Sequence, residues 1–124
     1  MAAVLDVKRS RRLRKAADFQ RVRVQRRSWA HPLLVLYVAP NAQDDTRVGI
    51  VTGRRVGNAV VRNRVKRRIR EAVRARYATL VGGVDLVWIA RQSSAAADFA
   101  DIADAVDQLV RRARLLRPRE SVGA

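Results

Sequence analysis

Arginine dominates the segment of the chain whose residue types are best suited to bind a ligand. Residues 62–76 contain eight basic residues, and seven of these are arginine. The planar guanidinium group forms paired hydrogen bonds with phosphate and stacks on bases, whereas a lysine ammonium does both less well. Asn63 lies among these cations and could hydrogen-bond a base edge or a ribose 2′-hydroxyl. The segment therefore predicts a surface that binds nucleic acid.

Side chains that could hydrolyse RNA are scarce in the same parts of the chain. Hydrolysis needs a general base, a general acid or a coordinated metal ion, and arginine stays protonated. The only histidine, His31, precedes Pro32 and is interpreted as an incidental loop residue. Asp18 and Glu71 are isolated acids within basic segments, and the chain has no cysteine. We therefore expect no catalytic residue and no metal site in the protein itself.

The charge of the chain is concentrated in two segments. There are 27 Lys and Arg against 11 Asp and Glu over 124 residues, a formal net charge of +16, and residues 8–27 and 54–76 hold ten basic residues each. This segregation indicates a surface for a polyanion. A hydrophobic content of 48% is too high for a solvated tail and predicts a folded domain. Without a long apolar run or a signal peptide, we expect a cytoplasmic protein that does not engage a membrane.

The elements that must position the basic residues form an α+β fold, with a small sheet packed against helices. Apolar spacing predicts helices over three segments, 16–27, 58–77 and 98–116. Strands are predicted over three more segments, the continuous apolar run 33–39 and the mainly apolar segments 47–52 and 84–90. The first two strands are separated by a short polar turn, so we expect them to pair as an antiparallel hairpin. The element order is therefore α-β-β-α-β-α.

The predicted elements place the domain in the middle of the chain. We expect a single RNA-binding domain over residues 12–117, preceded by a basic mobile arm at 1–11 and followed by a flexible tail at 118–124. Four aspartates lie in the first part of the helix predicted over 98–116, namely Asp98, Asp101, Asp104 and Asp107. They complement the helix dipole and point in diverging directions, so we interpret them as structural rather than as metal ligands.

The helix predicted over 58–77 has one apolar side and one basic side. At about 100° per residue, five apolar residues gather for packing on the sheet: Val61, Val65, Ile69, Ala72 and Val73. The basic residues and Asn63 occupy the rest of the helix surface. A helix that lies on a membrane would carry Trp, Phe or Leu on its apolar side, so this pattern favours nucleic acid as the partner.

The run from Gly57 to Glu71 contains Arg62-Asn63-Arg64 and resembles the signature of the bacterial ribonuclease P protein component. The resemblance extends in order over nearly the whole chain, from about Arg12 to Leu116. Segments 12–20, 32–38 and 47–49 match the opening helix and the first two strands of that family, and 85–91 matches a strand that ends in Ala-Arg.

The resemblance implies a small protein subunit of a ribonucleoprotein that removes the 5′ leader from precursor tRNA. In this family the large subunit is a catalytic RNA that carries the chemistry with bound Mg²⁺, so the protein needs no metal site and no small-molecule substrate. The resemblance further implies a left-handed crossover from the second strand through the signature helix to the third. General chain topology would instead predict a right-handed crossover.

The resemblance also implies two sets of binding residues. The set expected to bind the catalytic RNA is Arg62, Asn63, Arg64, Lys66, Arg67 and Arg70. The set expected to line a cleft for the leader, between the sheet and the first helix, is Phe19, Arg23, Tyr37, Thr52, Arg54, Arg55 and Arg91. Arg23 stands where the family often has a second aromatic residue, so one stacking platform is replaced by a cation. Whether Tyr37 lines the cleft or packs in the core stays open.

Two other classes of protein remain as alternatives on the residues alone. One is a basic ribosomal-type protein or RNA chaperone with no associated enzyme, and the other is an architectural protein that binds DNA. Both would use the same arginine-rich helix, because phosphate contacts dominate the affinity for any nucleic acid. The long ordered match to the signature favours the ribonuclease P subunit.

Overall fold

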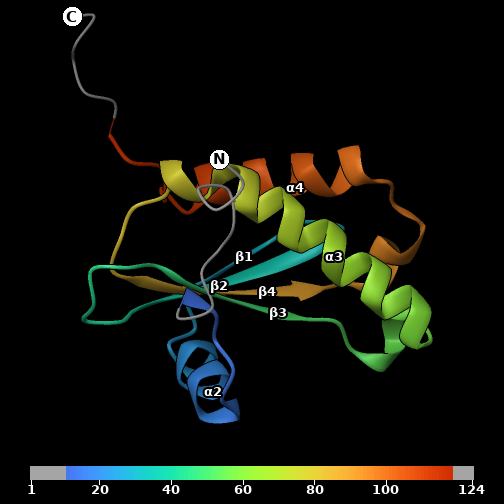
Figure 1. The fold of residues 1–124 in the computed structure, drawn as a ribbon, viewed down its shortest axis with the longest axis horizontal. Helices are drawn as coiled ribbons and strands as arrows, with labels where there is room; N and C mark the ends of the chain where they lie inside the picture. Colours follow the sequence, from blue (N-terminus) through green and yellow to red (C-terminus); the bar gives the residue numbers. More distant parts are fainter. Residues whose placement is uncertain (1–10, 119–124) are drawn as a thin grey trace, which may run out of the picture.

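A four-stranded sheet with helices on both faces forms the described part of the protein, residues 11–118 of a computed structural model. The predicted arm, apart from Arg11, and most of the predicted tail lie outside these residues. The helices and strands are α2 (Ala16–Val24), β1 (Ser28–Ala30), β2 (Leu34–Pro40), β3 (Arg47–Val51), α3 (Ala59–Arg76), β4 (Val84–Ala90) and α4 (Phe99–Arg112). Helices α3 and α4 cover one face of the sheet and α2 crosses the other (Figure 1). The predicted α+β class is confirmed.

The strand order in the sheet is β1-β2-β4-β3, so β4 lies between β2 and β3. It runs antiparallel to β2 and parallel to β3, with Trp88 opposite both Leu36 and Ile50. The predicted hairpin between segments 33–39 and 47–52 is therefore wrong. Strand β4 is the one most nearly buried on both faces, and such a strand is stabilised at the centre of a sheet, between two neighbours.

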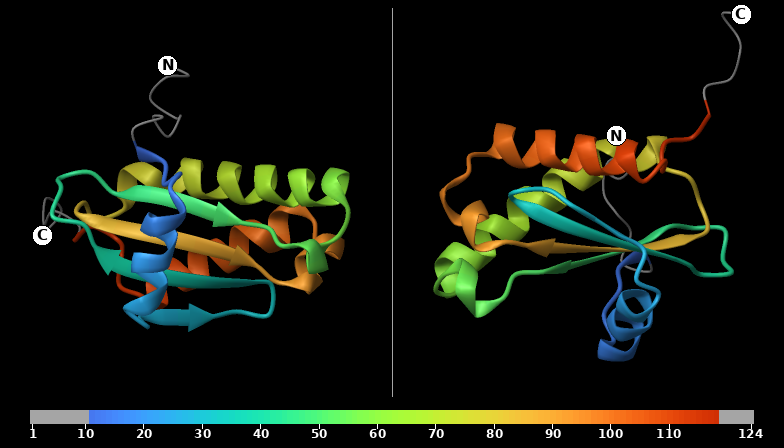
Figure 2. Two further views of the ribbon diagram at one scale, coloured as in Figure 1. Left: turned by 90° about the horizontal axis from the view of Figure 1, so that it is seen from below. Right: turned by 180° about the vertical axis from the view of Figure 1, so that it is seen from behind.

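The connection from β3 through α3 to β4 is left-handed. In the left view of Figure 2, β3 lies above β4, both strands point the same way, and α3 lies behind the sheet. The chain therefore winds in the sense that the resemblance implied and opposite to the general rule for parallel strands. The element order is also as predicted, except for the short additional strand β1, which pairs with β2.

Two helices begin at the residues expected to cap them. The Asn58 side chain accepts a hydrogen bond from the Val61 N–H at 3.0 Å, and the Asp98 side chain accepts one from the Asp101 N–H at 2.9 Å. These bonds satisfy backbone donors that have no partner inside the helix. None of the helices within residues 11–118 is long and apolar enough to cross a membrane.

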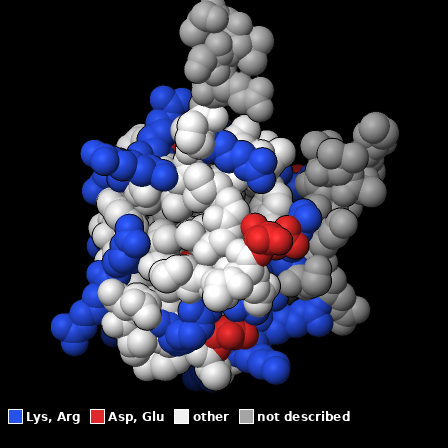
Figure 3. Space-filling view, turned by 90° about the vertical axis from the view of Figure 1, so that its left-hand side faces the viewer, with Lys and Arg blue, Asp and Glu red and all other residues white. Residues whose placement is uncertain are grey.

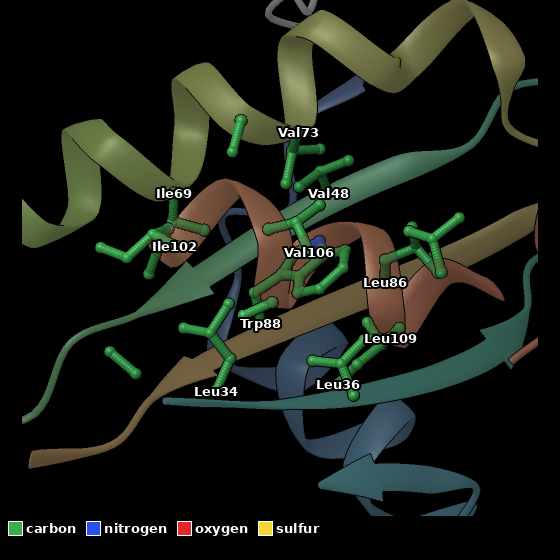
Figure 4. Close-up of a cluster of buried hydrophobic side chains, with 14 of the residues drawn as sticks. Leu34, Leu36, Val48, Ile69, Val73, Leu86, Trp88, Ile102, Val106 and Leu109 are labelled. Atoms are coloured by element: carbon green, nitrogen blue, oxygen red, sulfur yellow. The ribbon is translucent and has the colours of Figure 1, made fainter. Parts of the chain in front are cut away.

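The main core lies between the sheet and the helices α3 and α4 (Figure 4). Trp88 is fully buried at its centre, and the predicted apolar side of α3 supplies Val65, Ile69 and Val73. Ile102, Val106 and Leu109 from the middle of the helix predicted over 98–116 are buried in this core, but Phe99 and Leu116 near its predicted ends are 45% and 42% exposed. Helix α4 ends at Arg112, so the helical spacing does not extend to Leu116, and Leu115 is buried instead.

Candidate nucleic-acid interface

The solvent-facing side of α3 carries most of the residues expected to bind the catalytic RNA. Its apolar side is fixed in the main core, so the other side is left to solvent. Asn63 and Arg67 are exposed, and Arg62, Lys66 and Arg70 are half-buried. Among the ion pairs of residues 11–118, none involves any of these four cations. Their charges are therefore not neutralised by carboxylates of the described chain.

Arg64, the remaining member of this set, also has a role in the fold. Its Nη2 donates to the Ala95 carbonyl oxygen at 3.1 Å, and one turn later the Nη1 of Arg68 donates to the Ala97 carbonyl oxygen at 2.6 Å. The two arginines hold the 3-10 turn η4 (Gln92–Ala96) and Ala97 against α3. Only part of the Arg64 guanidinium is thus left for a ligand.

Phe19 of α2 and Tyr37 of β2 lie on the face of the sheet opposite α3 and α4. Both side chains are half-buried and pack on a second hydrophobic cluster, separate from the main core. Alternation along β2 explains the placement of Tyr37, because Leu36 and Val38 point into the main core and Tyr37 points the other way. The Arg23 guanidinium lies over the Tyr37 ring, 5.7 Å from its centroid. Tyr37 therefore lies on the face of the sheet that α2 crosses, outside the main core.

A glycine provides the space in which the Phe19 ring is seated. A Cβ atom at Gly49 of β3 would lie 2.5 Å from the Cε1 atom of Phe19, closer than two carbon atoms can approach. The ring therefore lies directly against the β3 backbone. Sequence reasoning placed Gly49 only within the second strand, although a glycine inside an apolar strand is a known sign of close approach by another group.

The residues expected to line one leader cleft are divided among several separate hollows. Phe19 lines a pocket of about 370 Å³ at the edge of β3, and Arg23 and Tyr37 line another of about 490 Å³. A larger groove of about 1060 Å³ is lined by the three basic residues Arg54, Arg55 and Arg91, together with apolar residues of β3 and β4. Thr52 directly follows β3 and is half-buried.

A buried carboxylate within the predicted strand 84–90 joins α2 to the sheet. Asp85 of β4 is fully buried and accepts hydrogen bonds from Arg47 of β3, with Nε–Oδ1 and Nη2–Oδ2 distances of 2.9 and 2.7 Å. It also accepts from Asn41 at 2.9 Å and from Arg21 of α2. One carboxylate thus joins α2, β3 and β4, and it fixes the position of the helix that carries Phe19.

The ionisation of Asp85 follows from these contacts. Burial alone raises the pKa of a carboxyl group, but the hydrogen bonds from Arg47 and Asn41 and the charges of Arg47 and Arg21 outweigh burial. The net result is a pKa for Asp85 below its ordinary value. The group is therefore a carboxylate at neutral pH, and its hydrogen bonds and ion pairs join α2, β3 and β4.

Three of the aspartates of the last helix, Asp98, Asp104 and Asp107, make side-chain hydrogen bonds within the fold. Asp98 caps α4, and Asp104 accepts a hydrogen bond from Gln108 at 2.7 Å. Asp107 pairs with Arg76 of α3, with an Nη2–Oδ2 distance of 3.0 Å, so it joins the two helices. The hydrogen bond from Arg76 lowers the pKa of Asp107.

Groups suited to hydrolytic chemistry are not assembled in the described residues. His31 turns back on its own loop, where its Nδ1 accepts the Leu33 N–H at 3.0 Å. Within residues 11–118, no three His, Asp or Glu side chains are grouped so as to hold a metal ion.

The end of the molecule where α3 and α4 terminate differs from the solvent-facing side of α3 in how its cations are paired. Figure 3 shows this end, with Lys and Arg side chains around a largely uncharged centre and with acidic side chains among them. Arg11 lies here, 3.3 Å from Asp45, and its guanidinium lies over the Tyr77 ring. Arg11 at this end is thus paired with a carboxylate, in contrast to Arg62, Lys66, Arg67 and Arg70 of α3.

Comparisons with known proteins identify similar chains along nearly the full length. The family model described as ribonuclease P matches residues 7–114. A ribonuclease P protein component of Herpetosiphon aurantiacus is 45% identical over 114 residues, which are 92% of this chain and 93% of the relative. One from Clostridioides difficile is 41% identical over 109 residues, 87% of this chain and 96% of the relative.

Solved structures give the same result for the fold. The Staphylococcus aureus RNase P protein superimposes with a TM-score of 0.80 at 31% identity, over 86% of this chain and 98% of that protein. The RNase P protein from Thermotoga maritima superimposes with a TM-score of 0.73 at 30% identity, over 81% of this chain and 96% of that protein.

Proposed function

The chain belongs to the family of ribonuclease P protein components, and we propose that it binds RNA for a reaction performed by an RNA subunit. As a ribonuclease P subunit it takes part in tRNA processing. The observation that carries the proposal is the solvent-facing side of α3, where Arg62, Lys66, Arg67 and Arg70 have no carboxylate partner among residues 11–118. The ribosomal-type, RNA-chaperone and DNA-binding alternatives are not favoured, because the family match covers residues 7–114.

The chemistry belongs to the catalytic RNA, with Mg²⁺ bound by that RNA. The acidic side chains of the described chain support this division of labour, since Asp85 and Asp107 are engaged by arginines and Asp98 caps a helix. When bound, Mg²⁺ would supply charge stabilisation and an activated water at the scissile phosphate. The protein contributes by positioning, and holding two reactants in the correct geometry can remove a large part of an activation barrier.

The two faces of the sheet serve two parts of the RNA assembly. The solvent-facing side of α3 docks on the catalytic RNA. It does so through the set expected to bind that RNA, namely Arg62, Asn63, Arg64, Lys66, Arg67 and Arg70. The α2 face holds the 5′ leader of precursor tRNA, where Phe19 and Tyr37 offer aromatic surface and Arg54, Arg55 and Arg91 offer charge. The cytoplasm is the compartment in which such a complex would process tRNA.

Arg67→Ala tests the contact between α3 and the catalytic RNA. Arg67 is exposed and lies opposite the buried side of the helix, so the substitution removes one phosphate contact without disturbing the core. We expect weaker binding to a bacterial ribonuclease P RNA, and a plot of log affinity against log salt that is shallower by about 0.7–0.9. Filter binding over a range of monovalent salt concentrations measures both quantities.

Arg111→Ala is the matched control, because it removes another exposed arginine, from the last turn of α4. It should leave the slope unchanged. Equal slopes for wild type and Arg67→Ala would contradict the assignment of α3 as the RNA-binding face. Equal losses for both variants would indicate a general charge effect in place of a defined contact.

A further inference from the structure

The groove of about 1060 Å³ at the carboxyl ends of β3 and β4 has two basic walls. One wall follows β3 and is formed by the short 3-10 turn η2 (Arg54–Val56), whose two arginines are exposed. The other wall follows β4 and is formed by Arg91 and the first two residues of η4, Gln92 and Ser93. The groove has no lining residue from α3. Any effect of α3 on this groove must therefore pass through η2 or η4.

The position of the η2 wall is set by its chain connection to α3. Gly57 and Asn58 join the two elements, and Gly57 has a φ of 155°, which glycine adopts far more readily than other residues. A Cβ atom at Gly57 would lie 2.8 Å from the Cβ atom of Val61, so the backbone that leaves η2 passes directly against the first turn of α3. The turns η2 and η4 lie side by side at this end of the molecule (Figure 2).

The η4 wall has no direct chain connection to α3 and is held there by side chains. At its start, the Ser93 hydroxyl donates to the Pro32 carbonyl oxygen at 2.5 Å. At its other end, Arg68 of α3 donates at 2.6 Å to the carbonyl oxygen of Ala97, a residue of the main core, and Arg64 adds a second bond one turn earlier. Short 3-10 turns have poor internal hydrogen bonds, so these outside bonds fix where η4 lies relative to α3.

Arg68 is better placed for this structural contact than for binding RNA. Its side chain is half-buried and its guanidinium is engaged by the Ala97 carbonyl oxygen, whereas the neighbouring Arg67 is exposed on the solvent-facing side of the helix. Hydrogen bonds from a charged donor are shorter and stronger than those between neutral groups. Arg68 also stands outside the set of residues expected to bind the catalytic RNA.

We propose that Arg68 is a positioning residue for the 5′ leader of precursor tRNA. By holding η4 on α3, it keeps Arg91 beside η2, so that the phosphates of the leader meet both basic walls of the groove. Arg68 itself does not touch the leader. The proposal rests on the function proposed above and extends it, because the helix that docks on the catalytic RNA then also fixes the groove that receives the substrate.

Arg68→Ala tests this role in the complex of the purified chain with a bacterial ribonuclease P RNA. We expect the affinity for leader-bearing precursor tRNA to fall about three- to tenfold, and the affinity for mature tRNA to stay unchanged, because only the leader uses the groove. Binding of the chain to the RNA subunit, and its dependence on salt, should also be unchanged, in contrast to Arg67→Ala. Arg111→Ala, which removes a charge from α4, should alter none of these quantities.

A double-mutant cycle with Arg91→Ala shows whether Arg68 acts through the η4 wall. Once Arg91 is removed, Arg68→Ala should cost little further affinity for precursor tRNA. Arg68→Lys, which keeps a cationic donor for the Ala97 carbonyl oxygen, should restore part of the loss. In the ¹⁵N-labelled free chain, the amide resonances of Gln92 and Ser93 should shift in Arg68→Ala, because the turn that carries them has lost a bond to α3.

Three results for Arg68→Ala would overturn its positioning role. They are a shallower salt dependence of binding to the RNA subunit, equal weakening toward precursor and mature tRNA, and a loss that adds fully to that of Arg91→Ala. Where circular dichroism shows Arg68→Ala to be unfolded, the shorter, uncharged Arg68→Gln replaces it in every measurement.

Failure of this role and failure of the proposed function give different results. A wild-type chain whose complex does not favour precursor over mature tRNA would overturn the leader-binding part of the proposed function. A wild-type complex that favours the precursor, together with an Arg68→Ala complex that favours it equally, would overturn only the role of Arg68.

Discussion

Asp85→Ala is expected to lower the free energy of unfolding by about 3 kcal/mol at neutral pH. The substitution removes the carboxylate that Arg47, Arg21 and Asn41 share, and it leaves Arg47 with only the more distant Asp18 at 3.9 Å and Arg21 with only the Pro40 carbonyl oxygen at 3.2 Å among the described residues. The loss falls at the lower end of the range for broken buried pairs, because both guanidiniums keep some contact with water. Urea denaturation followed by circular dichroism measures it.

The control for this effect is Asp104→Ala. Asp104 is exposed on α4 and bonds only to Gln108 of the same helix, so its loss should change stability by about 0.5 kcal/mol or less. Similar losses for the two variants would show that Asp85 has no special role in the fold.

The stabilisation by Asp85 depends on pH in a defined direction. Its pKa in the folded chain lies below the value of about 3.9 for an unfolded aspartate, so the folded state binds fewer protons. The contribution is therefore complete above about pH 4–5 and is lost as the pH falls through the folded pKa. The difference in stability between wild type and Asp85→Ala should shrink below about pH 4. A difference that grows on acidification would contradict the assigned direction.

Phe19→Ala is expected to weaken binding of leader-bearing precursor tRNA by about 1–3 kcal/mol, equivalent to about 5- to 150-fold. The ring is half-buried against Gly49 and provides the flat surface on which an unpaired base can stack. Binding of mature tRNA, which has no leader, should be unchanged. Affinities of the reconstituted complex for the two RNAs give the comparison.

The other phenylalanine of the chain supplies the matched control. Phe99 is 45% exposed at the start of α4, on the helix that covers the other face of the sheet. Phe99→Ala should leave both affinities unchanged. Equal weakening toward precursor and mature tRNA by Phe19→Ala would indicate a folding defect instead of a lost contact with the leader.

Local features of the sequence were sufficient to predict most elements but not their pairing. Asn58 and Asp98 mark helix starts because a capping side chain acts on the next few residues of the chain. Segment 84–90 is predicted to the residue, since six of its seven residues are apolar and Gly82-Gly83 marks its start. The partner of each strand depends on residues far apart in the chain, so the short turn at 42–46 wrongly suggested a hairpin. Strand β1 is too short to show a periodic pattern.

In the candidate site, too, some features follow from local sequence patterns and others depend on distant contacts. The basic side of α3 follows from helical periodicity, and the structure confirms that the opposite side is buried. The roles of Arg64 and Asp85 arise from contacts with η4 and α2, which no local pattern encodes. The left-handed crossover is likewise outside the reach of periodicity, and only the family resemblance predicted it.

The most direct test of the account is leader removal by a bacterial ribonuclease P RNA at low Mg²⁺, with and without the purified chain. Precursor tRNA is the substrate, and the rate at which the 5′ leader is released is measured. The account predicts a faster release when the chain is present, and a smaller gain for Arg67→Ala and Phe19→Ala than for Arg111→Ala. An unchanged rate with the wild-type chain, at concentrations that saturate its binding to the RNA, would contradict it.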